Sequence, residues 1–161
     1  MMRFCALAAV TLLAACSPQG GTETQVANAA AAQAVHPISG LEIIPLTVTS
    51  RSGKHDFRVE VAASTQEQAR GLMFRTQLGP DEGMIFPRQG NAQASFWMKD
   101  TPLPLDIIFI GPDSRISNIA AMTTPYSLDS VTSIGPASAV LELAGGRAEE
   151  LGIEAGDLVE Y

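Results

Sequence analysis

The chain has 161 residues, of which 46% are hydrophobic and 17% are charged, and its formal net charge is −7. This length suits one domain that can bury a core of its own. The acidic balance, without a basic stripe, makes nucleic acid and anionic lipid headgroups poor partners, because both require clustered Lys and Arg side chains.

The N-terminus has the pattern of an export signal. Arg3 precedes a short apolar run that ends in Leu13-Ala14-Ala15-Cys16, and this run is too short to span a bilayer. These last four residues resemble the lipobox of bacterial lipoproteins, which implies cleavage after residue 15 and lipidation of Cys16. An ordinary signal peptide cut nearby is the alternative. Because Ser17 stands where an Asp would resemble the inner-membrane retention signal, the resemblance favours the periplasmic side of the outer membrane. Inner-membrane anchoring and a soluble periplasmic form are the other destinations.

Residues 16–40 are expected to form a flexible tether after the signal peptide of residues 1–15. The stretch from Ser17 to Gly40 consists mainly of Ala, Gln, Gly, Ser and Pro, has one charge and shows no periodicity. His36 lies in it and is expected to be solvated. The mature domain then has no cysteine besides Cys16, which excludes a disulfide, a thiolate metal site and a cysteine nucleophile.

Residues 41–161 are predicted to form a single globular domain. It should open with a β-hairpin, because residues 41–50 and 55–64 are rich in β-branched residues and flank a short turn that contains Gly53. A short helix over about 65–74 follows, since Ser64 and Glu67 have the spacing of a capping box. Gly71 inside this helix suggests a close backbone approach.

The rest of the domain is predicted to be rich in short strands. Six apolar runs, separated by turn residues, cover 83–86, 94–99, 105–110, 115–121, 130–134 and 139–144. A second short helix that ends at Gly152, a tight turn at Gly156-Asp157 and a last strand complete the chain. Short strands at this spacing are typical of a curled or barrel-like sheet. The expected class is therefore a β-rich α+β domain with two short helices.

Several segments carry a family resemblance. They are Arg70-Gly71-Leu72-Met73-Phe74-Arg75, Gly83-Met84-Ile85-Phe86, Phe96-Trp97-Met98-Lys99-Asp100-Thr101, Pro104-Leu105-Asp106-Ile107-Ile108-Phe109, Leu141-Glu142-Leu143, Gly152-Ile153 and Gly156-Asp157. In this order they resemble the domain of unknown function 192 family over nearly all of residues 45–161. The resemblance implies a compact β-rich domain of bacterial and archaeal envelopes and brings no established activity, so the function must be argued from the site.

Two charged residues in apolar runs, Lys99 and Asp106, raise the question of a site. If residues 94–99 and 105–110 close a hairpin symmetrically, Lys99 faces Asp106 across the strands and Trp97 packs on Ile108. One interpretation is a structural ion pair in the wall of the barrel. The other is a pocket, in which these side chains converge to bind a small anionic or amphipathic ligand or another envelope protein.

Two arginines from the first signature segment are the remaining binding candidates. Arg70 and Arg75 would supply positive charge beside the aromatic wall of Trp97. Each also has a structural explanation: Arg70 lies one helical turn after Glu67 and can pair with it, and Arg75 can meet the last carbonyls of the helix.

Other chemistries have weaker support. Met73, Met84 and Met98 could together bind Cu(I), although methionine more often fills core space. Asp106 could act as an acid or base with Asp100 or Glu142, as in a hydrolase of envelope glycans. No nucleotide-binding, zinc-protease or serine-hydrolase motif occurs, and no cofactor is expected. A structural lipoprotein without a ligand is the third alternative.

Overall fold

A computed structural model describes residues 34–90 and 92–161. The expected signal peptide, the lipidation site at Cys16 and most of the expected tether lie outside the described residues. The described part is a mostly β domain with two short helices, as expected. Its elements are β1 (Ile43–Ser50), β2 (Gly53–Val61), α1 (Thr65–Arg70), β3 (Glu82–Pro87), β4 (Ser95–Phe96), β5 (Leu105–Ile110), β6 (Ile116–Ala120), β7 (Val131–Thr132), β8 (Ala139–Ala144), α2 (Arg147–Leu151) and β9 (Leu158–Glu160).

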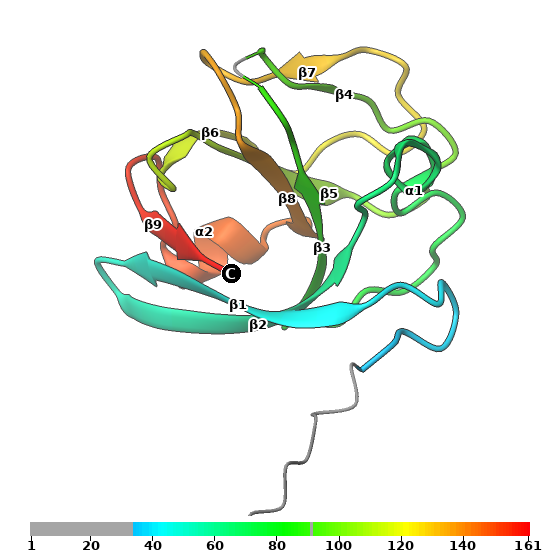
Figure 1. Ribbon diagram of the computed structural model, residues 1–161, viewed down its shortest axis with the longest axis horizontal. Coiled ribbons are helices and arrows are strands. Elements are labelled where there is room, and N and C mark those ends of the chain that lie inside the picture. The colour runs from blue at the N-terminus through cyan, green and yellow to red at the C-terminus, as the bar shows by residue number, and fades with distance from the viewer. Residues whose placement is uncertain (1–33, 91) are drawn as a thin grey trace, which may run out of the picture. The chain divides into compact units, whose positions relative to one another are not determined.

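Seven strands form one sheet that curls until its edges meet. The strand order is β6-β5-β8-β3-β2-β1-β9, and all neighbours are antiparallel except β2 and β3. An isolated bridge between Arg115 and Leu158 joins the start of β6 to the start of β9. Ile116 adds two backbone hydrogen bonds at this seam, to Asp157 and from Gly156. The sheet is therefore nearly closed, and Figure 1 shows β1, β2, β3, β8, β5, β6 and β9 arranged around the barrel.

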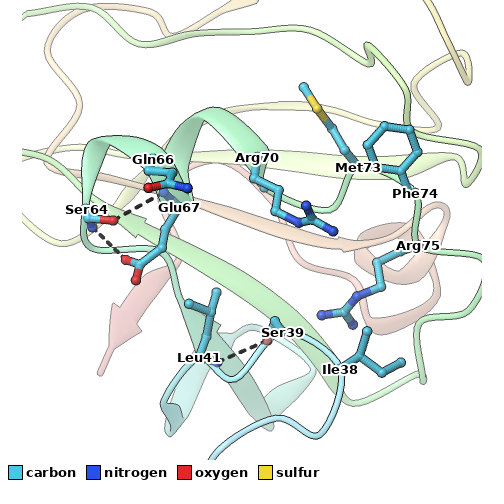
Figure 2. A pocket seen from close by; sticks show the side chains of 11 residues that line it. Ile38, Ser39, Leu41, Ser64, Gln66, Glu67, Arg70, Met73, Phe74 and Arg75 are labelled. Atoms are coloured by element: carbon cyan, nitrogen blue, oxygen red, sulfur yellow. Dashed lines mark hydrogen bonds between the residues drawn. The ribbon is translucent and has the colours of Figure 1, made fainter.

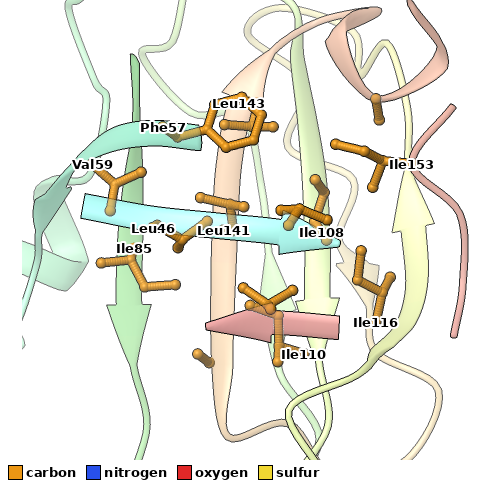
Figure 3. Close-up of a cluster of buried hydrophobic side chains, with 14 residues drawn as sticks. Leu46, Phe57, Val59, Ile85, Ile108, Ile110, Ile116, Leu141, Leu143 and Ile153 are labelled. Atoms are coloured by element: carbon orange, nitrogen blue, oxygen red, sulfur yellow. The ribbon is translucent and has the colours of Figure 1, made fainter. Parts of the chain in front are cut away.

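The neighbouring strands β5 and β8 separate two hydrophobic clusters. Alternate residues of these strands, such as Ile108 and Leu141, point into the barrel and join the cluster drawn in Figure 3. The residues between them, such as Ile107 and Val140, join a second cluster on the other face. All six residues of β5 are buried for this reason, and the two-faced burial explains the almost uninterrupted apolar run in the sequence.

The first hairpin and the capping box are confirmed. The hydroxyl of Ser64 accepts a hydrogen bond from the backbone of Glu67, and the Glu67 side chain accepts one from the backbone of Ser64. The helix ends at Arg70 because Gly71 adopts a positive φ of 47°, and a Cβ at Gly71 would lie only 3.3 Å from the Phe86 ring. The close approach expected at Gly71 is thus present.

The hairpin expected between residues 94–99 and 105–110 is wrong. Only Ser95 and Phe96 form strand β4, which pairs with β7, while both edges of β5 are occupied by β6 and β8. The chain leaves the extended conformation at Asp100, whose φ is 52°. A proline-containing loop then separates the two segments. Lys99 and Asp106 are consequently not cross-strand neighbours.

The folded domain also begins earlier than Leu41. Val35 bridges Glu42, and the backbone N–H of Ile43 donates to Ala34 at 2.6 Å. The His36 side chain is only 15% exposed and lies 3.7 Å from a Glu60 carboxylate oxygen. The expectation that His36 is solvated is therefore wrong. No helix among residues 34–90 and 92–161 is long and apolar enough to cross a membrane.

Candidate functional site

Asp106 is a buried anchor for backbone. Its side chain is completely buried, and its two oxygens accept three backbone N–H bonds, from Met122 at 2.8 Å, Gly146 at 2.9 Å and Ala148 at 2.8 Å. Helix α2 has no side-chain cap of its own. Asp106, which lies on β5, instead accepts hydrogen bonds from backbone N–H groups at the start of this helix. The carboxylate also holds two left-handed residues, Met122 with φ 49° and Gly146 with φ 86°. These contacts give Asp106 a structural role.

Lys99 and Trp97 lie together at the surface. The Lys99 ammonium is 5.6 Å from the centroid of the Trp97 ring, and Trp97 is 49% exposed. Such a cation–π contact is worth about 0.5–1 kcal/mol at an exposed position. Since Lys99 is exposed and Asp106 is bonded to backbone amides, the proposed Lys99–Asp106 ion pair is wrong.

Arg75 is a buried ion-pair residue. Its guanidinium donates to both carboxylate oxygens of Glu60, at 2.7 and 2.6 Å, and also lies against His36. The Ser39 hydroxyl donates a hydrogen bond to the same Glu60 carboxylate. The cluster fastens the segment before β1 to the domain. The sequence expectation that Arg75 meets the last helix carbonyls missed this partner.

Two cavities flank α1 and share Arg70, Gly71 and Met73. The first, which we call the Arg75 cavity, has a volume of about 440 Å³ and is lined by α1, by Ile38, Ser39 and Leu41, and by Arg75. Figure 2 shows the guanidinium groups of Arg70 and Arg75 facing this space. Its other charged lining group, Glu67, is engaged by the Ser64 capping box, and these hydrogen bonds lower the pKa of the Glu67 carboxyl. Most of the charge in the Arg75 cavity is therefore already paired.

The second cavity lies on the other side of α1 and is the better candidate. We call it the Glu142 cavity; it has a volume of about 370 Å³ and is lined by α1 and, among others, by Met73, Phe86, Arg88, Phe96, Trp97 and Glu142. The rings of Phe86 and Phe96 pack edge to face with centroids 5.0 Å apart. Of the predicted binding residues, Arg70 and Trp97 line this cavity together, whereas Arg75, Lys99 and Asp106 do not.

Glu142 is the unusual group of this cavity. It is only 4% exposed, and its Oε2 atom has no hydrogen-bond partner. Burial raises the pKa of the Glu142 carboxyl to about 8. A second cavity residue, Arg88, has a buried Nε atom that also lacks a partner. An unpaired buried polar group costs about 1–3 kcal/mol, so two of them in one cavity call for an explanation.

The expected acid–base pair of Asp106 with Glu142 is wrong. Asp106 is paired with Leu143 across β5 and β8, while Glu142 is paired with Ile107, so the two carboxyl groups point to opposite faces of the sheet. An acid–base pair of Asp106 with Asp100 is also excluded, because both oxygens of Asp106 accept hydrogen bonds from backbone amides.

The three methionines do not share one environment. Met84 and Met98 are buried in the second hydrophobic cluster, and the sulfur of Met98 accepts a hydrogen bond from Thr123. Met73 is partly exposed in the wall of both cavities. This distribution favours the packing interpretation for Met84 and Met98. Within the described ranges, no group of three or more His, Cys, Asp or Glu side chains is placed to hold a metal ion.

Two residues of the candidate site were missed or misjudged from sequence. The sequence suggests Glu142 only as a partner of Asp106, and it predicts no role for Arg88. The signal for Glu142 was present, because it is the one charged residue in the apolar run of residues 139–144. Its face of the sheet, however, could not be assigned without the pairing of β8 with β3 and β5.

Comparisons with known proteins agree with this fold. The chain is similar to a crystal structure of a protein of unknown function from Novosphingobium aromaticivorans, with 57% identity over 82% of this chain and 94% of that one and a TM-score of 0.79. It is also similar to a Sinorhizobium meliloti protein provisionally described as a transcription regulator, with 36% identity over 74% of this chain and 94% of that one and a TM-score of 0.72. No curated protein matches. The profile of the DUF192 family, described as an uncharacterised ACR, matches residues 47–161, and the chain therefore belongs to the DUF192 family.

Proposed function

We propose that this chain is a lipid-anchored protein of the bacterial envelope whose domain binds a small amphipathic ligand in the Glu142 cavity. The observation that carries the binding proposal is the Glu142 carboxyl, which is buried, unpartnered at Oε2 and part of a cavity wall. Cavities that bind small molecules usually combine apolar walls with a few polar groups of this kind and measure about 300–1,000 Å³. The anchoring proposal rests on the sequence from Leu13 to Cys16.

A binding role fits the cavity better than a hydrolase role. Glycoside hydrolysis uses two carboxyl groups on either side of the substrate. Of the residues described in the wall of the Glu142 cavity, only Glu142 carries a carboxyl group. Asp106, the acid or base of the alternative hypothesis, is fully buried on the other face of the sheet.

The description of the Sinorhizobium protein as a transcription regulator is not extended to this chain. DNA-binding proteins neutralise phosphates with clustered Lys and Arg side chains. This chain has 10 such residues against 17 Asp and Glu. Localisation in the periplasm would also separate this protein from the chromosomal DNA.

Native mass spectrometry tests the binding proposal. The protein is expressed from the 161-residue sequence, purified as the cell processes it and compared with Trp97→Ala and Glu142→Leu. We expect a bound mass in the wild type that both variants lose. Tyr126→Ala is the matched control, because Tyr126 is an exposed aromatic residue outside the cavity wall and its loss should leave the bound mass unchanged. A clean apo mass in the wild type would favour a structural lipoprotein instead.

Membrane fractionation tests the anchoring proposal. Replacing the thiol that would be acylated, in Cys16→Ser, should move the protein from the membrane to the soluble fraction and abolish labelling by a fatty-acid analogue. Cys5→Ser is the matched control, because Cys5 lies in the segment that cleavage would remove. Membrane association that survives Cys16→Ser would contradict the proposal.

A further inference from the structure

Unpaired positive charge gathers at the Glu142 cavity of an acidic chain. Arg70 and Arg88 line the cavity, and Lys99 lies over Trp97 at its wall. None of these three cations forms an ion pair within the described part of the chain, whereas Arg75 and Arg147 do. On a protein with a net charge of −7, three unpaired cations around one cavity favour a ligand with negative charge.

Two buried polar atoms without hydrogen-bond partners, on Arg88 and Glu142, indicate which negatively charged group the ligand carries. Arg88 donates to the Gln93 carbonyl through its terminal nitrogen at 3.3 Å, which leaves its buried Nε atom without an acceptor. Glu142 Oε2 is unpartnered in the same cavity. A carboxylate offers up to four acceptor sites and is a good partner for a guanidinium group. One carboxylate could therefore satisfy Arg88 and also accept from a protonated Glu142.

The apolar part of the cavity wall is mainly aromatic, and Thr65, Gln68, Ser95 and Thr101 add polar side chains to the lining. Phe86 is buried, Phe96 is partly buried and packs against both Phe86 and Phe109, and Trp97 is half exposed. Aromatic rings in these arrangements contact other rings or alkyl chains well. A volume of about 370 Å³ limits the ligand to a compact molecule.

We infer that the ligand of the Glu142 cavity is a small aryl- or alkyl-carboxylate, with its apolar body against Phe86, Phe96 and Trp97 and its carboxylate between Arg88, Arg70 and Glu142. The inference rests on the proposed binding function and specifies its ligand class.

The inference requires Glu142 to be in its acid form when the ligand is bound. Two carboxylates in contact repel each other, whereas a carboxylic acid donates a hydrogen bond to a carboxylate. Burial, which raises the pKa of Glu142 to about 8, keeps the acid form dominant at neutral pH. The charged groups that share the cavity wall with Glu142 are Arg70 from α1 and Arg88 after β3. The residues paired with Glu142 on the neighbouring strands, Met84 on β3 and Ile107 on β5, are apolar, and Asp106 points to the other face.

A ligand with an amine group is disfavoured by the same contacts. It would need an ionised Glu142 and would meet the guanidinium groups of Arg70 and Arg88. Binding of an amine would release a proton from Glu142, and binding of a carboxylate near pH 8 would take one up. The sign of the proton linkage therefore separates the two ligand classes.

Titration calorimetry of the protein expressed from the 161-residue sequence tests the inference. The probes are 3-phenylpropionate, its amide 3-phenylpropanamide and the amine 3-phenylpropylamine, with octanoate as the alkyl carboxylate. At pH 7 we expect at least one of the two carboxylates to bind about tenfold or more tightly than the amide and the amine. Its affinity should fall as the pH rises beyond 8, by up to about tenfold for each pH unit.

Three variants identify the residues. Glu142→Gln keeps the shape but cannot ionise, so carboxylate binding should persist and lose its decline above pH 8. Arg88→Gln should weaken carboxylate binding about tenfold or more and leave binding of the amide unchanged. Lys99→Ala is the control for general electrostatics and should retain the decline above pH 8.

The outcomes separate the inference from the function on which it rests. Equal binding of carboxylate and amide, tighter binding of the amine, or a decline above pH 8 that survives in Glu142→Gln would each overturn the carboxylate inference. These results would leave a ligand-binding cavity in place. If no probe binds, the carboxylate inference fails, and the presence or absence of a bound mass in the native spectrum then decides the proposed function.

Discussion

Asp106 and Glu142 lie on neighbouring strands and are buried to nearly the same degree, yet their surroundings differ completely. Asp106, on β5, is fully buried and receives three backbone N–H bonds. Glu142, on β8, is 4% exposed and has an oxygen without any partner. The sheet between them directs one carboxyl toward α2 and the other into a cavity. Burial of a charged residue therefore does not reveal its role; its partners do.

A third buried carboxylate, Glu60, completes the comparison. It is 3% exposed and is satisfied by side chains instead of backbone: Arg75, Ser39 and the nearby His36. The three carboxyl groups thus differ in their hydrogen-bond partners. Asp106 is bonded to backbone amides, Glu60 is bonded to side chains, and Glu142 has no partner at Oε2. Mutations at each should have different consequences.

The largest loss of stability is expected for Asp106→Ala. The change leaves three backbone N–H groups without their acceptor, including the first turn of α2 and two left-handed residues. We expect the free energy of unfolding in urea to fall by about 4 kcal/mol, as for loss of several hydrogen bonds to a charged group. Asp106→Asn, which keeps one carbonyl acceptor, should lose less. A change below 1 kcal/mol in Asp106→Ala would contradict the structural role.

Arg75→Ala should cost slightly less, about 3 kcal/mol, because it leaves the Glu60 carboxylate buried without its guanidinium. The matched control is the double variant Arg75→Ala with Glu60→Gln. It removes the uncompensated charge and should recover part of the loss in urea unfolding. If the double variant is no more stable than Arg75→Ala, the ion pair is not what Arg75 supplies.

Glu142→Gln should change the pH dependence of stability and increase stability at alkaline pH. The folded-state pKa of Glu142 is about 8 against an ordinary value of 4.5, so the folded state binds the proton more tightly than the unfolded state. The stability contributed by the acid form is complete below pH 4.5 and is lost as the pH rises to 8. We expect the stability difference between wild type and Glu142→Gln to change by about 2 kcal/mol over this window. This is less than the upper limit of about 1.4 kcal/mol for each unit of pKa shift, because the effective dielectric constant around buried groups exceeds that of dry protein.

Urea unfolding of both proteins at pH 5, 6, 7 and 8 measures this difference. Subtracting the two profiles removes the contribution of all other titrating groups. Parallel profiles would show that Glu142 titrates like an ordinary carboxyl and is in contact with water, which would remove the main peculiarity of the cavity.

Local patterns in the sequence were enough for much of the fold. The first hairpin, the capping box at Ser64 and the stop at Gly152 depend on spacing and turn chemistry within a few residues, and they are present. The curled sheet, expected from the regular spacing of short apolar runs, is also present. The site depends on contacts between distant parts of the chain. Residues 94–99 and 105–110 look like a hairpin locally, but the long-range pairing of β5 with β8 takes the place that the hairpin would need.

The same limitation explains which candidate residues lie together in the structure. Arg70 and Trp97 converge on one cavity because α1 and the segment after β4 both pack beside β3 and β8. The sequence does not reveal the partners of Arg75 and Asp106, because these partners, Glu60 and the backbone around α2, lie 15 or more positions away. Charged residues within apolar runs were a valid signal, although the sequence could not say what each one meets.

Lys99→Ala should have the smallest effect, below about 1 kcal/mol in urea unfolding, because the exposed ammonium contacts only the Trp97 ring among the described interactions. A double-mutant cycle with Asp106→Asn sharpens this expectation. If Lys99 and Asp106 do not touch, their effects should add within about 0.5 kcal/mol. A larger coupling energy would restore the ion pair that the local sequence suggests. Additivity, together with a large effect of Asp106→Asn alone, would show that backbone amides hold the carboxylate. The Lys99 ammonium would then have no carboxylate partner in Asp106 and would remain beside Trp97 at the edge of the Glu142 cavity.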